Sequence, residues 1–496
     1  MNIVLASNRG PIQYELTAEG KLVPKRGSGG VVAALSSVQG HLPFVWVCTP
    51  MTKGDLCVAN GDLGHGVLDG DGCRPTNLEF VVLSADTYRK YYDVISNGIL
   101  WFFHHYMLDL SREQCVGDSI AEAWDSGYTR ANRAFAEKVV EVSSRRDGRP
   151  VVLIQDYHLL LTPRMVKEWM PYAVVEYFSH IPWPEPRYWQ MLPPWMSRAI
   201  FNGLLGADIA GFQTPQDGAN FLSACGEVVP GAAVDLEAGE AYFEGHSCRV
   251  RSYPISVDPA ELRRTLRSPE GRGFIERLRT LAGEKTIVRV DRIEPTKNLV
   301  QGFRAFELLL ERNPDLLGKT RLLAFLVGCR ERLSVYRRYR REVLDIIEQV
   351  NARFGTEGWR PIEVFLENNY VQALAGLSLY DVLLVNPIID GMNLVAKEGP
   401  AVNTRNGVLV LSSAAGAYRQ LKEGALSVAP SDLEGTVQAL EQALRMPLRE
   451  RKRLAQLLRQ AVEQEDIRLW VELQLADIEQ LIIERDYTPA SRQRAA

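Results

Sequence analysis

The sequence is poor in cysteine, and its cysteines show no pairing pattern. Its 496 residues hold 7 cysteines, an odd number, and no two of them stand in a CxxC spacing. A framework of disulfides is therefore not expected, and the reducing cytoplasm is the predicted location.

Long apolar runs are also absent. No stretch approaches the roughly 18–20 consecutive apolar residues that a membrane span requires. The apolar run at the N-terminus is too short for a signal peptide. We therefore expect a soluble protein that does not use a membrane as a partner.

Neither sign of charge dominates the composition. Lys and Arg total 57 against 61 for Asp and Glu, which gives a net charge of −4. A protein that binds the nucleic-acid backbone needs a dense basic face, so no nucleic acid partner is expected. A few arginines hardly change this total, and a local basic pocket for one or two phosphates is compatible with it.

The common catalytic motifs are missing as well. The sequence holds no G-x-S-x-G, HExxH, P-loop or GxGxxG pattern, so hydrolase, zinc protease, NTPase and dehydrogenase hypotheses lack support. His104 and His105 are adjacent on an expected helix and point apart. Asp69-Gly70-Asp71 lies in a run rich in Gly and Asp, which favours an exposed turn over a metal site. We expect neither a metal nor a cofactor.

What the chain does contain is an alternation of short apolar runs with amphipathic segments. Most of the runs are continuous rather than alternating, which is typical of parallel strands covered on both faces. The alternation predicts an α/β fold with doubly wound sheets. The predicted strands are residues 3–7, 45–49, 80–83, 151–156, 174–180, 209–213, 286–292, 322–327, 362–366, 382–386 and 408–411.

The series of strands is interrupted between about residues 231 and 272, where only two short strands are expected. We predict an N-terminal domain over 1–254, joined by a C-terminal helix over 468–487, and a second domain over 255–467. Thr214-Pro215 predicts a helix start, and Ser431-Asp432-Leu433-Glu434 fits a capping box. Ligands in open α/β sheets bind beyond the carboxyl ends of the strands, so the residues that follow strands are the candidates for a site.

In the second domain, one strand leads directly into Arg292 and Lys297, five residues apart. A guanidinium and an ammonium at the start of a helix are suited to a diphosphate. The alternative is a surface loop whose cations form solvated salt bridges.

The next candidate segment is Asp390-Gly391-Met392-Asn393-Leu394-Val395-Ala396-Lys397-Glu398, where a strand ends, a glycine turn follows and a helix begins. The backbone N–H groups of residues 391–393 are placed to bind hydroxyls or a phosphate. The two carboxylates suit the vicinal hydroxyls of a sugar or a ribose. The alternative for Asp390 is an ordinary helix N-cap, and for Glu398 a solvated side chain.

In the first domain, titratable groups follow neighbouring strands. Asp156-Tyr157-His158 ends one predicted strand, His180 ends the next, and Arg9 follows the first. A glycine cluster at 27–30 precedes an expected helix and permits close backbone approach to a ligand.

Taken together, these residues resemble the trehalose-6-phosphate synthase family, which are retaining glycosyltransferases of the GT-B type. The resemblance spans nearly the whole chain in family order, and the run from Asp390 to Glu398 is its most specific part. The matching segments are Ser7-Asn8-Arg9, Gly29-Gly30, Tyr91-Tyr92, Ser96-Asn97, Leu100-Trp101, Asp156-Tyr157-His158-Leu159, His180-Ile181-Pro182, Gly211-Phe212-Gln213-Thr214, Asp291-Arg292 with Lys297, and Asp390 to Glu398.

The resemblance implies two Rossmann-like domains that face each other across a cleft, with an acceptor site in the first domain and a nucleotide-sugar site in the second. It implies that Arg292 and Lys297 bind the donor diphosphate, that Glu398 binds its ribose, and that His180 lies against the transferred glucose. The implied donor-binding residues are Gly30, Arg292, Lys297, Asp390, Gly391, Met392, Asn393, Leu394, Val395 and Glu398. The implied acceptor-binding residues are Arg9, Tyr92, Trp101, Asp156 and Arg330, and the implied catalytic residues are Asp156, His180, Arg292 and Lys297.

The implied activity is the transfer of glucose from GDP-glucose or UDP-glucose to glucose 6-phosphate, which forms α,α-trehalose 6-phosphate. Several positions depart from the family pattern, among them Glu294-Pro295-Thr296 for the common aspartate-tyrosine-serine, Ile389 for an arginine and Gly399 for a tyrosine. The departures resemble an actinobacterial-type branch, some of whose members prefer GDP-glucose. They leave the donor base and the acceptor open.

Two alternatives accompany this interpretation. One is a related glycosyltransferase or pseudo-glycosyltransferase with another phosphorylated acceptor. The other is a non-catalytic homologue that senses sugar phosphates, which predicts loss of the sugar and diphosphate residues that this chain retains. The sequence leaves the oligomeric state open, a homo-oligomer included.

Overall fold

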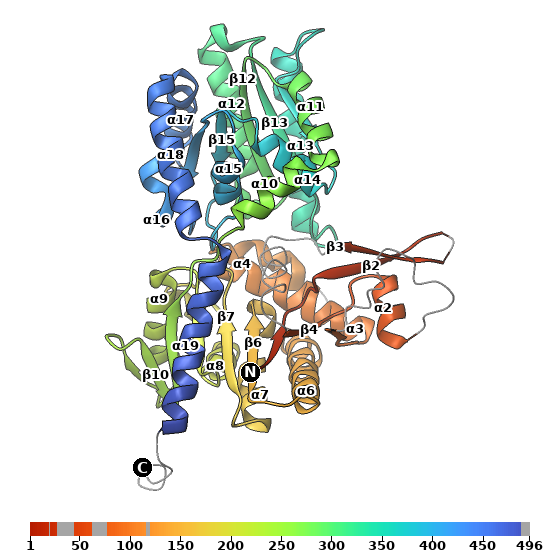
Figure 1. Ribbon diagram of the computed structural model, residues 1–496, viewed down its shortest axis with the longest axis vertical. Helices are drawn as coiled ribbons and strands as arrows, with labels where there is room; N and C mark the ends of the chain where they lie inside the picture. Colours follow the sequence, from red (N-terminus) through yellow and green to blue (C-terminus); the bar gives the residue numbers. More distant parts are fainter. Residues whose placement is uncertain (19, 27–43, 62–76, 116–119, 488–496) are drawn as a thin grey trace. The chain divides into compact units, whose positions relative to one another are not determined.

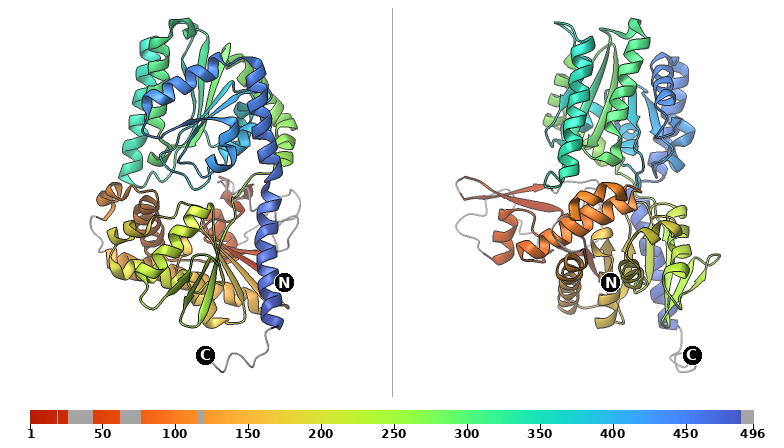
Figure 2. Two further views of the ribbon diagram at one scale, coloured as in Figure 1. Left: turned by 90° about the vertical axis from the view of Figure 1, so that its left-hand side faces the viewer. Right: turned by 180° about the vertical axis from the view of Figure 1, so that it is seen from behind.

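The computed structural model describes residues 1–18, 20–26, 44–61, 77–115 and 120–487. The chain divides into two compact units (Figures 1 and 2). The first unit holds residues 1–253 and the chain from 468 onward, and the second holds residues 254–467. The role expected for each domain stays a prediction.

The first unit is built on a nine-stranded sheet in the order β5-β4-β1-β6-β7-β8-β11-β10-β9. All neighbours from β5 to β11 pair in parallel, and β10 and β9 add an antiparallel edge. When the strands from β5 to β8 in this sheet are numbered by their order along the chain, they read 3-2-1-4-5-6, which is the Rossmann order. The strands are β1 (Asn2–Ala6), β4 (Phe44–Cys48), β5 (Leu78–Phe80), β6 (Pro150–Gln155), β7 (Val174–Phe178), β8 (Ile209–Phe212), β9 (Ala233–Asp235), β10 (Glu240–Phe243) and β11 (His246–Ser252).

Helices cover this sheet, and a separate hairpin of β2 (Ile12–Leu16) and β3 (Leu22–Arg26) lies outside it. The last helix, α19 (Ile467–Tyr487), runs beside this sheet (Figure 2). It is held there by a hydrogen bond from Tyr253 to Asp477 and by the ring contact of Phe178 with Trp470. The other helical segments are α2 (Lys53–Asn60), α3 (Ala85–Tyr88), η1 (Arg89–Leu100), α4 (Trp101–His104), η2 (Leu108–Cys115), α5 (Ile120–Ala123), η3 (Trp124–Thr129), α6 (Arg130–Ser144), η4 (Tyr157–Leu159), α7 (Thr162–Trp169), η5 (Pro186–Met191), α8 (Pro194–Leu204) and α9 (Pro215–Val228).

The second unit repeats the same topology in a wholly parallel six-stranded sheet, ordered β14-β13-β12-β15-β16-β17. In chain order this again reads 3-2-1-4-5-6. Its strands are β12 (Lys285–Arg292), β13 (Thr320–Val327), β14 (Ile362–Phe365), β15 (Val382–Val385), β16 (Val408–Ser412) and β17 (Ala425–Val428). Its helical segments are α10 (Pro259–Arg267), α11 (Pro269–Leu281), η6 (Pro295–Lys297), α12 (Leu299–Arg312), η7 (Pro314–Leu316), α13 (Ser334–Phe354), α14 (Tyr370–Leu377), α15 (Val395–Val402), α16 (Tyr418–Leu421), η8 (Lys422–Gly424), α17 (Leu433–Arg445) and α18 (Leu448–Gln464).

The α/β prediction is confirmed, and the strands are continuous apolar runs because both faces of each sheet are covered. On one face of the second sheet, alternate residues Leu322, Ala324 and Leu326 are fully buried in a core that includes Phe303 and Phe306 of α12. At about 25 cal/mol per Å² of apolar surface, such burial is the main favourable term for each unit.

Several local expectations were wrong. The strand expected at 80–83 is β5 (Leu78–Phe80), since Val81 makes the last bond to Cys48 and the chain then turns to the cap of α3 at Ser84. Three strands rather than two occupy 231–272, and β17 was missed. At α17 the N-cap is Asp432, not Ser431, because its side chain accepts from the N–H of Gly435. Thr214 caps α9 as predicted.

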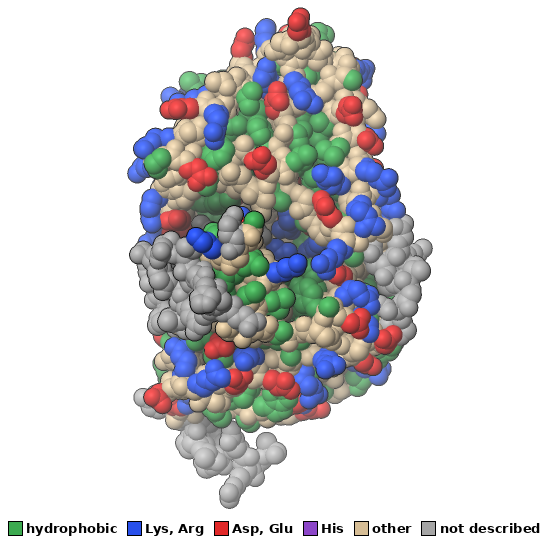
Figure 3. Space-filling model, turned by 90° about the vertical axis from the view of Figure 1, so that its right-hand side faces the viewer, with side chains coloured by type: hydrophobic (Ala, Val, Ile, Leu, Met, Phe, Trp, Pro, Cys, Tyr) green, Lys and Arg blue, Asp and Glu red, His purple; other side chains and the backbone are tan. Residues whose placement is uncertain are grey.

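No helix among the described residues is both long and apolar enough to cross a membrane. Acidic and basic side chains are interspersed over the face in Figure 3, in keeping with the small net charge.

Candidate active site

The second unit brings its predicted residues to one point of the sheet edge. The strand order reverses between β12 and β15, and ligands of open α/β sheets bind at such a switch point, beyond the carboxyl ends of the strands. Arg292 ends β12, Lys297 follows it within η6, and Asp390 follows β15. Residues 93 positions apart in the chain therefore meet at the carboxyl edge.

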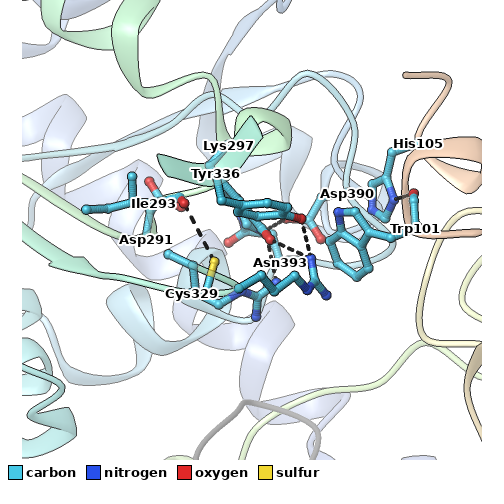
Figure 4. A network of polar contacts seen from close by, with 12 residues as sticks. Trp101, His105, Asp291, Ile293, Lys297, Cys329, Tyr336, Asp390 and Asn393 are labelled. Carbon is cyan, nitrogen blue, oxygen red and sulfur yellow. Dashed lines mark hydrogen bonds and ion pairs between the residues drawn. The ribbon is translucent and has the colours of Figure 1, made fainter. Parts of the chain in front are cut away.

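Lys297 and Asp390 form an ion pair at this point, and Asn393 joins it. The Lys297 ammonium donates to Oδ2 of Asp390, and Nδ2 of Asn393 donates to the same oxygen at 3.0 Å (Figure 4). The Lys297 side chain is 12% exposed and that of Asp390 15%. An anion that reaches this site therefore meets a cation whose position is already fixed.

The segment 390–394, called here the sugar loop, is not a helix start. α15 begins at Val395, so Asp390 is not its N-cap, and Leu394 stands at the cap position. The loop is fixed by the next loop instead: the N–H of Gly416 donates to Asp390 O at 3.0 Å and that of Ala417 to Met392 O at 2.8 Å. Within the described part of the chain, the N–H groups of residues 391–393 donate to no protein acceptor.

Glu398 lies in the first turn of α15 and is buried, at 9% exposure. Tyr370 donates its hydroxyl to Oε1 of Glu398 at 3.2 Å. Burial raises the pKa of Glu398 to about 7, although the bond from Tyr370 opposes the shift. The alternative given for Glu398 in the sequence analysis, a solvated side chain, is therefore wrong.

Arg330, which follows β13, shares the carboxylate of Glu294 with Arg292. Its Nη1 donates to the Tyr336 hydroxyl at 2.6 Å and to Oε2 of Glu294 at 3.2 Å. Arg292 donates to the other oxygen of Glu294 at 2.7 Å. Sequence reasoning treated Glu294 only as a departure from a family pattern. Chemistry could have pointed to Glu294, because arginines that gather at one sheet edge need a negative charge beside them.

The first unit has its own switch point between β1 and β6, and the same kinds of residue lie there. Arg9 follows β1 and donates from Nη2 to the Tyr92 hydroxyl at 3.0 Å. The Tyr92 ring stacks on His158, with ring centroids 5.7 Å apart and planes 12° apart. The structure thus joins two residues predicted to bind the acceptor, 83 positions apart in the chain.

Trp101 opens α4 and is buried, at 6% exposure. Its ring stacks on that of His105 at 4.2 Å, and Nδ1 of His105 contacts the Trp101 carbonyl at 2.7 Å (Figure 4). Nδ1 of His104 contacts the carbonyl of Pro182. The two histidines therefore engage different partners, and neither takes part in a metal cluster among the described residues.

Asp156 and His180 follow the neighbouring strands β6 and β7 and are connected directly. The N–H of His180 donates to Oδ1 of Asp156 at 3.2 Å. The His180 ring lies between Gln155 Oε1, 2.8 Å from Nε2, and Gln213 Nε2, 3.4 Å from Nδ1. Burial lowers the pKa of His180 to about 3, so the ring is neutral at physiological pH.

Three of the predicted site residues adopt a left-handed backbone. Their φ angles are 75° at Asp156, 49° at Arg330 and 74° at Asn393. Non-glycine residues in this region cost about 1–3 kcal/mol each and cluster at functional sites. The strain thus supports the selection of these residues on grounds independent of their charge.

Three expectations from the sequence fall outside the described residues: the glycine cluster at 27–30 with the helix expected after it, Gly30 as a donor-binding residue, and the Asp69-Gly70-Asp71 turn. Among the described residues, no group of three or more His, Cys, Asp or Glu side chains is arranged to hold a metal ion. The binding and catalytic roles of the site residues stay predictions.

Comparison with known proteins identifies relatives along almost the whole chain. Residues 1–480 match the model of glycosyltransferase family 20. A trehalose-6-phosphate synthase of Mycolicibacterium paratuberculosis is 32% identical over 482 residues, 95% of this chain and 93% of the relative. An α,α-trehalose-phosphate synthase (UDP-forming) of Dictyostelium discoideum is 29% identical over 94% of this chain, which spans 61% of that protein's length.

Solved structures agree with this assignment. A trehalose-6-phosphate synthase from E. coli bound to UDP-2-fluoro glucose is 27% identical with a TM-score of 0.80, over 97% of this chain and 99% of that one. An α,α-trehalose-phosphate synthase (UDP-forming) of Burkholderia xenovorans in complex with glucose 6-phosphate is 26% identical with a TM-score of 0.80, over 97% and 100%. The predicted GT-B fold is confirmed. The chain belongs to glycosyltransferase family 20, the family of the trehalose-6-phosphate synthases.

Proposed function

We propose that the protein transfers glucose, with retention of configuration, from a nucleotide-glucose to glucose 6-phosphate and so forms α,α-trehalose 6-phosphate. The observation that carries the proposal is the group at the switch point of the second unit. Lys297 pairs with Asp390 there, Arg292 ends the strand that leads to Lys297, and the N–H groups of residues 391–393 bond to no acceptor among the described residues. The names of the relatives support the same reaction.

On the donor side, Arg292 and Lys297 bind the diphosphate, and the sugar loop binds the transferred glucose. Asp390 accepts from glucose hydroxyls, and the N–H groups of residues 391–393 donate to them. Glu398, at the start of α15, binds the ribose. The base of the donor is uracil or guanine, and the similarity to a protein bound to UDP-2-fluoro glucose supports a uracil donor.

On the acceptor side, Arg9, Tyr92, Trp101 and Arg330 bind glucose 6-phosphate, and Asp156 accepts from its hydroxyls. The Arg9–Tyr92 hydrogen bond supports the first two assignments, since it holds the guanidinium in one orientation. The similarity to a protein solved with glucose 6-phosphate supports this acceptor.

The chemistry requires no protein nucleophile. The bond between C1 of glucose and the diphosphate oxygen breaks, and the acceptor hydroxyl oxygen bonds to C1 from the same face. The departing diphosphate takes the proton of that hydroxyl. The protein's contribution is then to stabilise the charge that develops on the diphosphate and to position the two substrates. Because two cations do this work, no metal is needed, and EDTA should leave the rate unchanged.

The test is nucleotide release by the purified protein with glucose 6-phosphate and, separately, UDP-, GDP- and ADP-glucose. Turnover with one donor, and trehalose 6-phosphate as the product, is the expected result. Binding of a donor without turnover would reject this acceptor in favour of another phosphorylated acceptor. If no donor binds, the protein is the non-catalytic sensor of sugar phosphates.

A further inference from the structure

A buried carboxylate lies between the cations of the second unit. The Glu294 side chain is fully buried, at 0% exposure. One of its oxygens, Oε1, accepts from Arg292 at 2.7 Å, and the other, Oε2, accepts from Arg330 at 3.2 Å. The ammonium of Lys297 lies 4.0 Å from Oε1. One side chain therefore lies within 4.0 Å of three cations that the family resemblance assigns to two different substrates.

The backbone fixes this carboxylate firmly. The N–H of Ile293 donates to Val327 O at 2.8 Å and so ties the end of β12 to the end of β13. The N–H of Lys297 donates to Glu294 O at 3.1 Å, and Cys329 Sγ contacts Ile293 O at 3.6 Å (Figure 4). Because β12 delivers Arg292 and β13 leads to Arg330, Glu294 lies where the two arginines meet.

The burial of a charged carboxylate at position 294 calls for a physical explanation. Burial alone would raise the pKa of Glu294, but the charges of Arg292, Arg330 and Lys297 outweigh it and lower the pKa to about 2. Glu294 is therefore ionised at every physiological pH. A buried ion pair adds little net stability, since its desolvation offsets its attraction. A buried carboxylate at this place is better explained by what it does to the arginines.

The geometry indicates that the Glu294 carboxylate orients the guanidinium groups of the two arginines. A guanidinium binds a phosphate best through two parallel N–H bonds, which requires its plane to be fixed. The Arg292 side chain is 44% exposed, so its bond to the carboxylate restricts a side chain that solvent would otherwise leave mobile. The Arg330 side chain is 13% exposed, and its bond to the same carboxylate sets its direction within the packed surroundings. Tyr336 supplies a second contact to Arg330.

We propose that Glu294 is a shared positioning residue, whose two carboxylate oxygens orient Arg292 toward the donor diphosphate and Arg330 toward the phosphate of the acceptor. The assignment of each arginine to its phosphate rests on the proposed function. The sharing itself rests only on the contacts of Glu294. Glu294 touches no substrate in this proposal, and it acts through the two arginines.

The test combines Glu294→Gln with Arg292→Ala and Arg330→Ala. Glu294→Gln keeps the shape and removes the charge, and we expect it to raise the KM of both substrates by about fivefold or more. Each arginine variant should raise the KM of one substrate only. In the Arg292→Ala background, Glu294→Gln should change only the acceptor KM, and in the Arg330→Ala background only the donor KM. If Glu294 only supported the fold, the KM that responds to Glu294→Gln would not depend on which arginine is missing.

Glu434→Gln is the matched control, because Glu434 pairs with Arg312 on the exposed surface of the same unit at 2.6 Å. It should change neither KM. If Glu294→Gln does not fold, Glu294→Met replaces it in the same cycles, since it keeps the length of the side chain and removes both carboxylate oxygens. The proposal is overturned if the Glu294 variant changes only one KM or neither. It is also overturned if the effect of the Glu294 variant on each KM is the same with and without each arginine.

The same experiments separate this inference from the proposed function. If the wild-type protein turns over no donor with glucose 6-phosphate, the proposed function fails. Glu294 is then tested by the rise in melting temperature that UDP or GDP and inorganic phosphate produce in the wild type. Loss of both stabilisations in Glu294→Gln would support the sharing, and retention of either would reject it.

Discussion

At the scale of single residues, the second unit keeps its cations paired before any substrate is present. Lys297 is bound by Asp390, and Arg292 and Arg330 by Glu294. The spacing in the sequence was enough to select Arg292 and Lys297, because both follow one strand. It could not place Arg330 and Arg292 on the same carboxylate, since that arrangement depends on β13 pairing with β12.

Loss of either donor cation should remove stabilisation of the departing diphosphate. We expect Lys297→Ala or Arg292→Ala to lower kcat/KM by a hundredfold or more, about 3 kcal/mol of transition-state stabilisation. Steady-state kinetics with the preferred donor measure the effect. Lys422→Ala, an exposed lysine of the same unit, is the control and should retain full activity. Near-normal rates in both site variants would contradict the assignment.

Glu398 should give donor binding a pH dependence. Its pKa of about 7 lies above the ordinary value for a carboxyl, so the group is mostly neutral at pH 6 and mostly ionised at pH 8. Only the ionised form accepts bonds from both ribose hydroxyls. The donor Kd should therefore fall up to about tenfold from pH 6 to pH 8. Calorimetric titration with the nucleotide-glucose, which has no titrating group in this range, measures it, and Glu398→Gln should flatten the profile. A wild-type Kd that is equal at both values would remove Glu398 from the site.

At the scale of elements, apolar patterning was a good guide to parallel strands and a poor one to antiparallel strands. The continuous runs of β1, β6, β12 and β13 were found because both of their faces are buried. The β2–β3 hairpin was missed, although Ile12, Tyr14 and Leu16 alternate with polar residues in the period-2 pattern of a half-exposed strand. The edge strands β9 and β17 are only three and four residues long, and only pairing with a neighbour makes them strands.

The packing of α12 on β12 offers a test of how the donor site is supported. A Cβ at Gly302 would lie 1.9 Å from Nη1 of Arg289, a buried side chain that donates to Asp291 and to the carbonyl of Lys297. Gly302→Ala should therefore destabilise the protein by about 1–3 kcal/mol through overpacking, despite its better helix propensity. It should also lower kcat/KM, because Arg289 anchors Lys297.

Thermal unfolding and donor kinetics measure these effects. The control is Gly273→Ala in α11, where an added Cβ meets nothing within 4 Å. This variant should be neutral or slightly stabilised. Equal melting temperatures for the two variants would show that Arg289 moves aside without cost.

At the scale of the whole molecule, two units with the same strand order each carry a cluster of candidate residues at the switch point. The chain leaves the second unit through segments that pack on each other, since the N–H of Ile467 donates to Val257 O at 3.0 Å. Lys397, directly before Glu398, donates to Ile255 O at 2.7 Å and is fully buried. The helix that carries the predicted ribose ligand is thus tied to the segment at the start of its unit.

Lys397 should make the stability of the protein depend on pH. Burial lowers its pKa to about 7, although the charge of Glu465 opposes the shift. Between pH 7 and the ordinary lysine value near 10.4, the unfolded chain binds a proton that the folded protein does not. The free energy of unfolding of the wild type should therefore rise relative to Lys397→Met, by about 2 kcal/mol from pH 7 to pH 9.

Urea unfolding at the two pH values measures this difference. Lys422→Met is the control, and its stability should follow that of the wild type at both values. A constant gap between wild type and Lys397→Met would mean that the buried amine stays charged.

The sequence by itself determined the α/β class, most of the parallel strands and the residues that follow them, because these depend on local patterning and on the chemistry of side chains close together in the chain. The tertiary structure alone decided which strands are neighbours, and hence that Lys297 meets Asp390, Arg9 meets Tyr92 and Glu294 lies between two arginines. The physical reason is that strand order is set by how whole faces are buried, a property of the packed sheet rather than of any one segment.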